Sequence, residues 1–548
     1  MTAAPNLRPR RTPKYSGLFH DEIATDSYWI RERGTIRLPP LGPAGPVVVT
    51  GTVLAADPAA PWSGGELGLR ATLGEGAPVV RANLPAGDFR LELAVPESAT
   101  TNPSELGLEL LGVGRSNLLA WLGRVTGFGP WQPWRTQARN RRLRIRRIEA
   151  GGDKCGSLGG EVLVDFSNRA APWNTAFARR HAAVGLNIAG FFRADLGIGE
   201  SARCMARAAD ATGVPVALVD LKLPCKNPLG DDTFAARLQP ENPHPVNVFH
   251  LDAPAAFDLD HHHGDGFRRG RYNIGYWAWE LPEFPDAWAH YGDFFDEVWA
   301  PSRFAAEAIA EKVLVPVLAM PHAISFNRPQ GDFRGKFGLP ADKFLFLFLY
   351  DLNSYSERKN PAAVLDAFRR SGLAGRGAAL VIKVHGAATN GADLDRLRAA
   401  CADLPGTVLL AQTLKRAEVY ELESACDCFV SLHRSEGFGL AVAECMYLGK
   451  PVIATDWSAT AEYLDATNGF PVRCRLVTLD RHHGPYAKGS TWAEPDTAHA
   501  AECMQCVHAD AGSRERLGTA ARATIEEKFA PAVIGARYRR RLAAIADR

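Results

Sequence analysis

Two successive series of apolar runs constrain the fold of this chain more than any other feature. The first series starts near residue 183 and the second near residue 343, and helical stretches separate many of the runs. The runs are 182–192, 215–221, 245–251, 272–279 and 297–302, followed by 343–352, 378–386, 406–414, 426–434 and 450–457. Strands that alternate with helices are typical of a parallel sheet covered on both faces. The sequence therefore predicts an α/β fold with two doubly wound, Rossmann-like domains in tandem.

Residues 1–180 have a different pattern. Short runs of alternating apolar and polar residues recur there, as in 46–54, 88–96 and 106–114, and clusters of Gly, Pro, Asn or Asp separate them. Period-two alternation with frequent turn residues is typical of an antiparallel β-sandwich. We therefore expect an N-terminal β-rich accessory domain over residues 1–180.

The domain boundaries follow from these patterns. A proline- and glycine-containing stretch, 316–342, is the expected linker between the two Rossmann-like domains. We place the first domain at 181–328 and the second at 329–529. The last helix, 530–548, has apolar residues near helical spacing and is expected to pack back on the first domain.

Composition excludes several classes of protein. A formal net charge of +2 on 548 residues predicts no binding of nucleic acid. No apolar run reaches 18 residues, and the basic N-terminus is not followed by an apolar segment, so we expect neither a membrane-spanning helix nor a secretory signal. The ten cysteines are scattered, which favours buried thiols in a cytoplasmic protein.

The stretch 118–149 is rich in aromatic residues and then in arginine. One interpretation is an edge of the sandwich followed by a charged strand. The sharper one is a surface that contacts anionic lipid headgroups through Trp121, Trp131, Trp134 and the arginines in 139–147, which would place the protein at the inner face of the cytoplasmic membrane.

The sequence "SEGFGLAVAE" (435–444) is the strongest candidate for a functional site. It lies between an apolar run and another strand, in the order strand, loop, helix, strand, so Glu436 falls at the end of a strand where such sheets bind ligands. Gly437 and Gly439 allow backbone amides to approach a bound group, and the helix that follows favours an anion at its N-terminus. Glu444 falls about one turn inside that helix. Carboxylates bind vicinal hydroxyls, so the pattern points to a sugar nucleotide, and the expected donor-binding residues here are Gly437, Phe438, Gly439, Leu440 and Glu444.

A diphosphate also requires cations. Arg358 and Lys359 follow the first strand of the second domain, and Asn360 with Pro361 is a typical start of a helix. Arginine can bind a phosphate through two N–H groups and lysine adds a point charge. A solvated charge pair is the alternative, but the nearby glutamate loop favours the phosphate interpretation.

The segments "RKNP", "HRSEGFGLAVAE" and "GKPVIATD" together resemble the retaining GT-B glycosyltransferases of family four, which include many bacterial exopolysaccharide and O-antigen transferases. The likeness covers about residues 185 to 548; "YNIGYWAWELPEFPDAW", "RADLGIGESAR" and "WAEPD" are similar to a subgroup that builds surface polysaccharides. It implies that Glu436 contacts the donor sugar, that Glu444 holds the ribose, and that Lys359, with Arg358, steadies the leaving diphosphate. It also implies retention of configuration, no metal and no cofactor besides the nucleotide-sugar donor.

Two positions depart from the family pattern. Many relatives have an arginine five residues before the lysine, where this chain has Ser354. Many also have a histidine where this chain has Trp279, with Glu280 next to it, so Glu280 and His250 are candidates to replace that histidine. Gly197 and Gly199 form the glycine loop of the first domain, and either approach the donor phosphates or the acceptor or simply make a tight turn.

The expected function is therefore transfer of a sugar from a nucleotide diphosphate to a glycan or polyprenyl-linked glycan acceptor in the synthesis of bacterial surface polysaccharide. Two alternatives remain open. One is a GT-B nucleotide-sugar epimerase, which would need no acceptor. The other is a non-enzymatic glycan-binding scaffold in which the β-sandwich is the active part.

Overall fold

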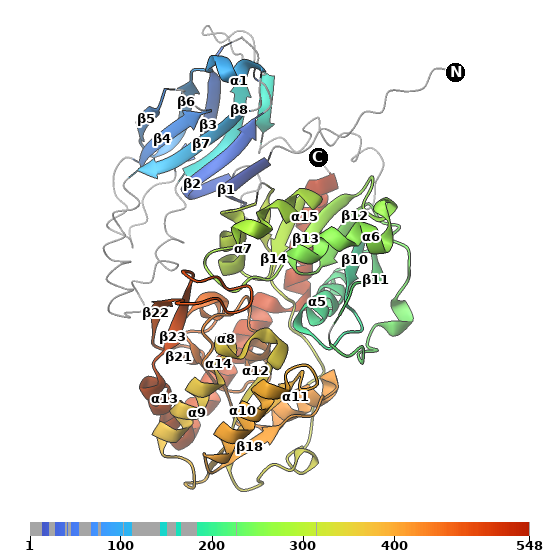
Figure 1. Ribbon diagram of the computed structural model, residues 1–548, viewed down its shortest axis with the longest axis vertical. Coiled ribbons are helices and arrows are strands. Elements are labelled where there is room, and N and C mark those ends of the chain that lie inside the picture. Colours follow the sequence, from blue (N-terminus) through green and yellow to red (C-terminus); the bar gives the residue numbers. More distant parts are fainter. Residues whose placement is uncertain are drawn as a thin grey trace.

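The computed structural model describes residues 14–20, 28–38, 41, 45–53, 67–74, 78–101, 104–111, 143–150, 161–165, 184–225, 227–313 and 315–546. Three bodies follow one another along the chain (Figure 1): an antiparallel sheet in blue, a parallel α/β unit in green, and a second α/β unit in yellow to red. Residues Trp121, Trp131, Trp134 and 139–142 of the predicted lipid-contacting stretch lie outside the described residues.

The N-terminal strands form one antiparallel sheet in the order β5-β4-β7-β2-β8-β3-β6, with β1 beside β2 and β9 beside β8. Its elements are β1 (Lys14–His20), β2 (Tyr28–Leu38), β3 (Val47–Val53), β4 (Leu67–Leu73), β5 (Val80–Leu84), β6 (Gly87–Leu93), α1 (Glu97–Thr101), β7 (Ser104–Leu111), β8 (Leu143–Ala150) and β9 (Glu161–Asp165). Alternate side chains of β6 are buried, as period two requires. Because β4 also contacts β6 near the other edge, the sheet folds over itself and encloses an apolar core. The predicted antiparallel domain is confirmed.

The first α/β unit has a six-stranded parallel sheet in the order β11-β10-β12-β13-β14-β15. Its elements are β10 (Leu186–Gly190), α5 (Gly197–Ala211), β11 (Val216–Asp220), β12 (Val246–His250), α6 (Leu259–His263), β13 (Tyr272–Tyr276), β14 (Glu297–Ala300), α7 (Arg303–Ala310) and β15 (Val317–Ala319). Every residue of β10, β12 and β13 is buried, because a parallel sheet has both faces covered. The N-terminal sheet reaches this unit through β1, which contacts α7 and β15.

The second unit has a six-stranded parallel sheet in the order β18-β17-β16-β19-β20-β21. Its elements are β16 (Phe344–Asp351), α8 (Ser356–Lys359), α9 (Pro361–Ser371), β17 (Ala378–His385), α10 (Gly391–Ala402), β18 (Thr407–Leu410), α11 (Arg416–Ala425), β19 (Cys428–Ser431), α12 (Leu440–Tyr447), β20 (Val452–Thr455), β21 (Phe470–Val472), the hairpin β22 (Cys474–Thr478) and β23 (Thr491–Pro495), α13 (Thr497–Ala509), α14 (Ala511–Phe529) and α15 (Pro531–Ala546). The strand order reverses between β16 and β19. The two predicted Rossmann-like units of a GT-B fold are confirmed.

Local chemistry explains where several of these helices begin. Asn360 has the left-handed backbone conformation, and its side-chain oxygen accepts a hydrogen bond from the backbone N–H of Ala363 at 3.4 Å at the start of α9. Asp496 caps α13 in the same way, accepting from Ala498 and His499 at 3.1 Å each. Pro361 follows Asn360 at the first helical position, as the sequence predicted.

Two features differ from the sequence-based expectations. β15 lies inside the expected linker 316–342, where a run of three residues was too short to stand out. The hairpin β22–β23 forms a separate two-stranded sheet. The last helix behaves as expected: α15 packs on α5 of the first unit, and its Arg541 forms a buried ion pair with Glu297 of β14 (Nε–Oε1 3.1 Å), which ties the two units together.

Candidate active site

The candidate active site lies where the strand order of the second sheet reverses. The chain leaves β16 towards β17 on one side, and β19 pairs with the other side of β16. Doubly wound sheets bind their ligands at the carboxyl ends of the strands at such a reversal. Glu436 follows β19, and Arg358 and Lys359 follow β16. The structure therefore brings these three predicted residues to one place. Arg358 and Lys359 lie in the single helical turn α8 rather than in the expected loop.

Glu436 is held by two cations. Its Oε1 lies 2.5 Å from Nζ of Lys359, and its Oε2 lies 3.2 Å from Nη1 of Arg358. Nη1 of Arg358 also donates to the carbonyl of Ser435 at 2.9 Å. Glu436 is 8% exposed and Arg358 is 4% exposed. Burial alone would raise the pKa of Glu436, but Lys359 and Arg358 outweigh it and lower that pKa to about 2, so the carboxylate is charged at any physiological pH.

Glu280 approaches this group from the first unit. Its Oε1 lies 3.7 Å from Nη2 of Arg358, and its Oε2 accepts a hydrogen bond from the hydroxyl of Tyr486 at 3.0 Å. The hydroxyl of Ser435 donates to the backbone carbonyl of Glu280. Tyr486 belongs to the segment between β22 and β23, and its ring lies 5.6 Å from that of Trp279. Arg358 therefore joins carboxylates from both units, and the hairpin segment closes one side of the group.

The glycines of the loop allow the two units to approach. A Cβ on Gly437 would lie 2.9 Å from the carbonyl oxygen of Trp279, a distance that real side chains do not reach. Gly439 has φ +86°, and a Cβ there would lie 2.6 Å from Cγ2 of Thr460. Phe438 is buried against His322 and Tyr463, and Leu440 is the first residue of α12. A larger residue at Gly437 would therefore push the units apart.

Glu444 lies in a second charged cluster. Its carboxylate forms an ion pair with Arg416 of α11, and Nε of Arg416 lies 3.7 Å from Oε2 of Glu200 on α5. Glu200 also pairs with Arg207 and with Arg203 at 2.8 Å. Burial would raise the pKa of Glu200, but the arginines, Arg207 foremost, lower it well below its ordinary value. Glu444 is thus linked through Arg416 to the first unit.

A third glutamate near Arg416 has no partner. Glu423 of α11 is 1% exposed, and neither of its carboxylate oxygens has a hydrogen-bond partner in the described part of the chain. Burial raises its pKa to about 8, against the influence of Arg416 and Lys383. Burial also lowers the pKa of Lys383 to about 8. Glu423 is therefore largely protonated at neutral pH.

The structure does not bring His250 into the Glu436 cluster. His250 is fully buried, its Nδ1 lies 2.8 Å from the hydroxyl of Ser201, and its ring stacks on Tyr276 at 4.4 Å. Burial lowers its pKa well below the ordinary value. Ser354 lies half-buried in the 3₁₀ turn η10 (Leu352–Ser354), ahead of α8.

The two glycines of the first unit differ. A Cβ on Gly199 would lie 2.5 Å from the carbonyl oxygen of Phe191, so Gly199 is required by the tight turn into α5. A Cβ on Gly197 would meet no atom within 4 Å. Only Gly197 therefore stands beside open space, where a ligand could approach.

Sequence reasoning missed three residues of these clusters: Tyr486, Arg416 and Glu200. Glu200 directly follows the glycine loop, so the sequence could have predicted its place at the start of the helix but not its ion-pair partners. Arg416 and Tyr486 carry no local motif, because their places depend on how α11 and the hairpin segment fold back. Their roles become visible only through contacts across the units.

In the described ranges, no group of three or more His, Cys, Asp and Glu side chains is arranged to hold a metal ion. Among the same ranges, no helix is both long and apolar enough to cross a membrane.

One family model matches part of the chain. Residues 330–475 match the model "Glycosyl transferases group 1", a segment that contains Arg358, Lys359, Glu436 and Glu444. The matched segment lies within the second unit. Among curated proteins, no sequence matches the chain.

Several solved structures are similar to the two α/β units at low sequence identity. HepE of Anabaena, in complex with UDP and glucose, is 14% identical, with 66% of this chain and 99% of HepE covered and a TM-score of 0.47. Sucrose-phosphate synthase of Thermosynechococcus elongatus is 16% identical, with 66% and 100% covered and a TM-score of 0.49. A glycosyltransferase of Rickettsia africae is 13% identical, with 67% and 99% covered and a TM-score of 0.49.

Proposed function

We propose that this protein is a retaining glycosyltransferase that moves a sugar from a nucleotide-diphosphate donor to an acceptor hydroxyl. The observation that carries the proposal is Glu436 held between Arg358 and Lys359 at the switch point of the second sheet. The glycosyl transferases group 1 match includes all three residues. A doubly wound sheet binds its ligand at this point, and a charged carboxylate beside two cations suits a sugar joined to a diphosphate.

The two cations would stabilise the leaving diphosphate. Negative charge grows on the phosphate oxygens as the bond to the sugar breaks, and fixed cations in a buried site lower that barrier by several kcal/mol. Arg358 has a buried Nε–H without a hydrogen-bond partner among the described residues, so one donor remains unused. Lys359 is held nearby by Glu436 alone among carboxylates. These two side chains would supply the positive charge that the reaction needs.

Glu436 would exchange partners when the donor binds. In the structure its two oxygens neutralise Lys359 and Arg358. Phosphate oxygens would compete for these cations, which would free the carboxylate to accept hydrogen bonds from sugar hydroxyls. Its pKa of about 2 keeps it an acceptor at neutral pH. The same residue would thus hold the cations in place before binding and orient the sugar afterwards.

Glu444 would hold the ribose of the nucleotide. It lies near the start of α12, whose N-terminus follows the glycine loop, and its present partner is Arg416. Two ribose hydroxyls would donate hydrogen bonds to the Glu444 carboxylate, as the guanidinium of Arg416 does now. This role rests on the resemblance to family four and on the position of Glu444 in α12, the helix that follows the glycine loop.

The acceptor side belongs to the first unit. Glu280 stands across from Glu436, and the loop that carries it contacts Gly437. On the likeness of "YNIGYWAWELPEFPDAW", "RADLGIGESAR" and "WAEPD" to surface-polysaccharide enzymes, the acceptor is a glycan or polyprenyl-linked glycan, and the protein works in the cytoplasm at the inner face of the membrane. Exclusion of water when the units close would favour transfer over hydrolysis.

A donor screen tests the proposal. UDP- and GDP-sugars are tested for their effect on thermal stability, because a ligand that binds only the folded protein raises its Tm by mass action. The donor found is then supplied with a labelled sugar and glycan acceptors. Transfer that is lost in Glu436→Gln but kept in Glu357→Gln supports the proposal, since Glu357, which is exposed in α8 next to Arg358, undergoes the same change. Free epimerised nucleotide sugar without acceptor-dependent transfer would refute it in favour of an epimerase.

A further inference from the structure

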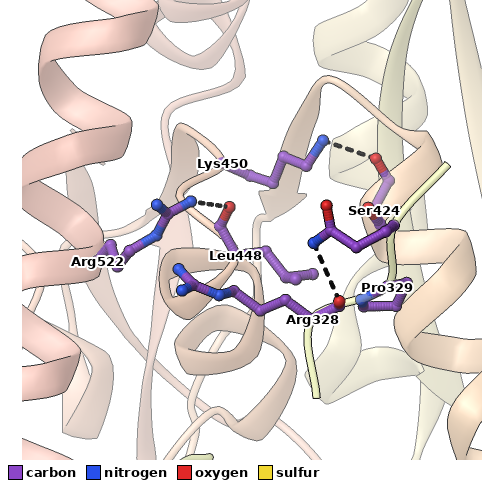
Figure 2. Close-up of a pocket in the computed structure, with 7 residues that line it drawn as sticks. Arg328, Pro329, Ser424, Leu448, Lys450 and Arg522 are labelled. Atoms are coloured by element: carbon purple, nitrogen blue, oxygen red, sulfur yellow. Dashed lines mark hydrogen bonds between the residues drawn. The ribbon is translucent and has the colours of Figure 1, made fainter. Parts of the chain in front are cut away.

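A hollow lined by cations lies at the far end of α12 from the candidate active site. α12 starts directly after Gly439 and ends at Tyr447, and the next residue, Leu448, lines the hollow (Figure 2). The other walls come from Arg328 and Pro329 in the segment between the units, Ser424 at the end of α11, Lys450 before β20, and Arg522 on α14. Arg328, Lys450 and Arg522 thus reach one place from three distant parts of the chain.

No acidic side chain lines this hollow. Lys450 donates through Nζ to the carbonyl of Ser424 at 2.7 Å, and Arg522 donates through Nη2 to the carbonyl of Leu448 at 2.8 Å. Arg328 lies over the ring of Tyr447, with Cζ 5.7 Å from its centre. None of the three forms an ion pair within the described ranges. Carbonyl partners satisfy single N–H groups but leave three positive charges without a counter-ion.

We propose that this hollow binds a phosphate-bearing anion. Three like charges that share one recess repel one another, and an anion between them would replace that repulsion by attraction. The nearest acidic influence on Lys450 comes from Asp427, which is itself paired with Arg334 at 2.8 Å. The cluster therefore gains its counter-ion from outside the chain.

The unused donors fit a tetrahedral anion. Nε and Nη2 of Arg522 bind carbonyls, which leaves Nη1, and Nζ of Lys450 has two hydrogens left after its bond to Ser424. The guanidinium of Arg328 is exposed and keeps its full set of N–H groups. Free N–H groups from three side chains that line one hollow suit the several oxygens of a phosphate better than the two of a carboxylate.

The hollow lies where the segment that connects the two units meets the second unit. Arg328 belongs to the segment that connects β15 of the first unit to β16 of the second, whereas Lys450 and Arg522 belong to the second unit. A bound anion would tie the connecting segment to α12 and α14. The inference does not depend on sugar transfer, because binding is measured directly.

The test uses inorganic phosphate titrated calorimetrically into the full chain. The Arg358 and Lys359 site also attracts phosphate, so the expected result is binding with two components. Arg328→Gln should weaken one component by about fivefold or more, and Arg328→Gln with Lys450→Gln should remove it. Lys359→Ala should leave that component intact, and Arg369→Gln, an exposed arginine on α9, should change neither.

Arg328 is exposed, and its side chain forms no hydrogen bond with any residue that the structure describes, so its replacement leaves the fold intact. Phosphate affinity unchanged within twofold in Arg328→Gln and in the double variant would overturn the proposal. Vesicles of phosphatidylcholine with and without phosphatidylglycerol identify the source. Vesicle binding that the double variant loses points to a lipid headgroup, and loss of phosphate binding alone points to a free phosphate compound. Binding of neither probe overturns the site.

Discussion

The two glutamates at positions 436 and 444 belong to one short segment, yet the rest of the chain supports them differently. Glu436 is bound by Lys359 and Arg358, which are neighbours in sequence and come from the same unit. Glu444 is bound by Arg416, which also reaches Glu200 of the other unit. The first carboxylate therefore depends on one loop, whereas the second depends on how the two units meet.

This difference suggests a division of tasks. The partners of Glu436 are the cations that a diphosphate would need, so losing any of the three should affect the chemical step. Arg416 links Glu444 to Glu200 on α5, so, under the proposed role of Glu444 in ribose binding, its loss should affect donor binding and the closure of the units. Variants that change turnover or donor affinity separately can test this division.

The largest effect is expected for Glu436→Gln. The substitution keeps the volume of the side chain but removes the charge that holds Lys359 and Arg358. We expect turnover to fall by about 10²- to 10³-fold, the usual loss when one preorganised electrostatic group is removed. Initial rates at saturating donor measure the effect.

Glu357→Gln is the matched control, since it changes an exposed carboxylate in α8, next to Arg358. It should keep wild-type turnover and the wild-type far-UV circular dichroism spectrum. A Glu436→Gln enzyme with more than half the wild-type turnover would remove Glu436 from the reaction.

The next effect is expected for Arg416→Gln. It leaves Glu444 without its ion pair and Glu200 with one arginine fewer. We expect the KM for the donor to rise about tenfold or more while turnover falls less, and the free energy of unfolding to drop by about 2 kcal/mol. Steady-state kinetics over a range of donor concentrations and thermal melts measure the two changes.

Exposed Arg376 provides the control, and Arg376→Gln should alter neither KM nor Tm. If Arg416→Gln lowered turnover and left KM unchanged, the two glutamates would share one task and the comparison would fail.

Much of the fold could be predicted from the sequence, because a strand that is buried on both faces is a continuous run of apolar residues. The strands β10, β12 and β13 are buried along their whole length, and each coincides with an apolar run that the sequence displays. β15 and the hairpin β22–β23 were not predicted, because β15 has only three residues and neither strand of the hairpin alternates regularly between buried and exposed residues. Short, amphipathic pieces are fixed by their neighbours rather than by their own composition.

The candidate site was readable to the extent that its residues follow strands. Glu436, Arg358 and Lys359 stand at strand ends that meet at one sheet edge, so topology alone predicts their proximity. His250 also stands at a strand end, but Ser201 and Tyr276 enclose it in the core. Whether a side chain at a strand end points into the site or into the core depends on the helices that pack on the sheet, and the sequence pattern does not predict that packing for His250.

Glu423 sharpens the comparison because it is a glutamate near Arg416 that lacks a partner. The unfolded chain releases this proton above about pH 4.5, whereas the folded chain keeps it until about pH 8. Stability from this group is therefore complete below pH 4.5 and is lost as the pH rises towards 8. The loss amounts to about 5 kcal/mol in total.

Glu423→Gln removes this titration. We expect the difference between the Tm of the variant and the Tm of the wild type to rise by about 5 °C or more, in favour of the variant, from pH 5 to pH 8. Thermal melts at pH 5, 6, 7 and 8 measure the difference, and Glu515→Gln, a change at an exposed glutamate, should show none. A constant difference between variant and wild type would mean that Glu423 is charged in the folded protein.

The smallest effect is expected for Tyr486→Phe. Its hydroxyl donates to Glu280 at 3.0 Å, and Glu280 in turn lies 3.7 Å from Arg358. Loss of one hydrogen bond to a charged group costs about 1.5 kcal/mol, so kcat/KM for transfer should fall about tenfold. The loss should appear in turnover rather than in the KM for the donor, because Tyr486 acts through the partners of Glu436. Tyr291→Phe, at a half-buried tyrosine of the first unit, is the control and should be silent. A rise in donor KM without a change in turnover would instead place the hairpin segment with Glu444, on the nucleotide side.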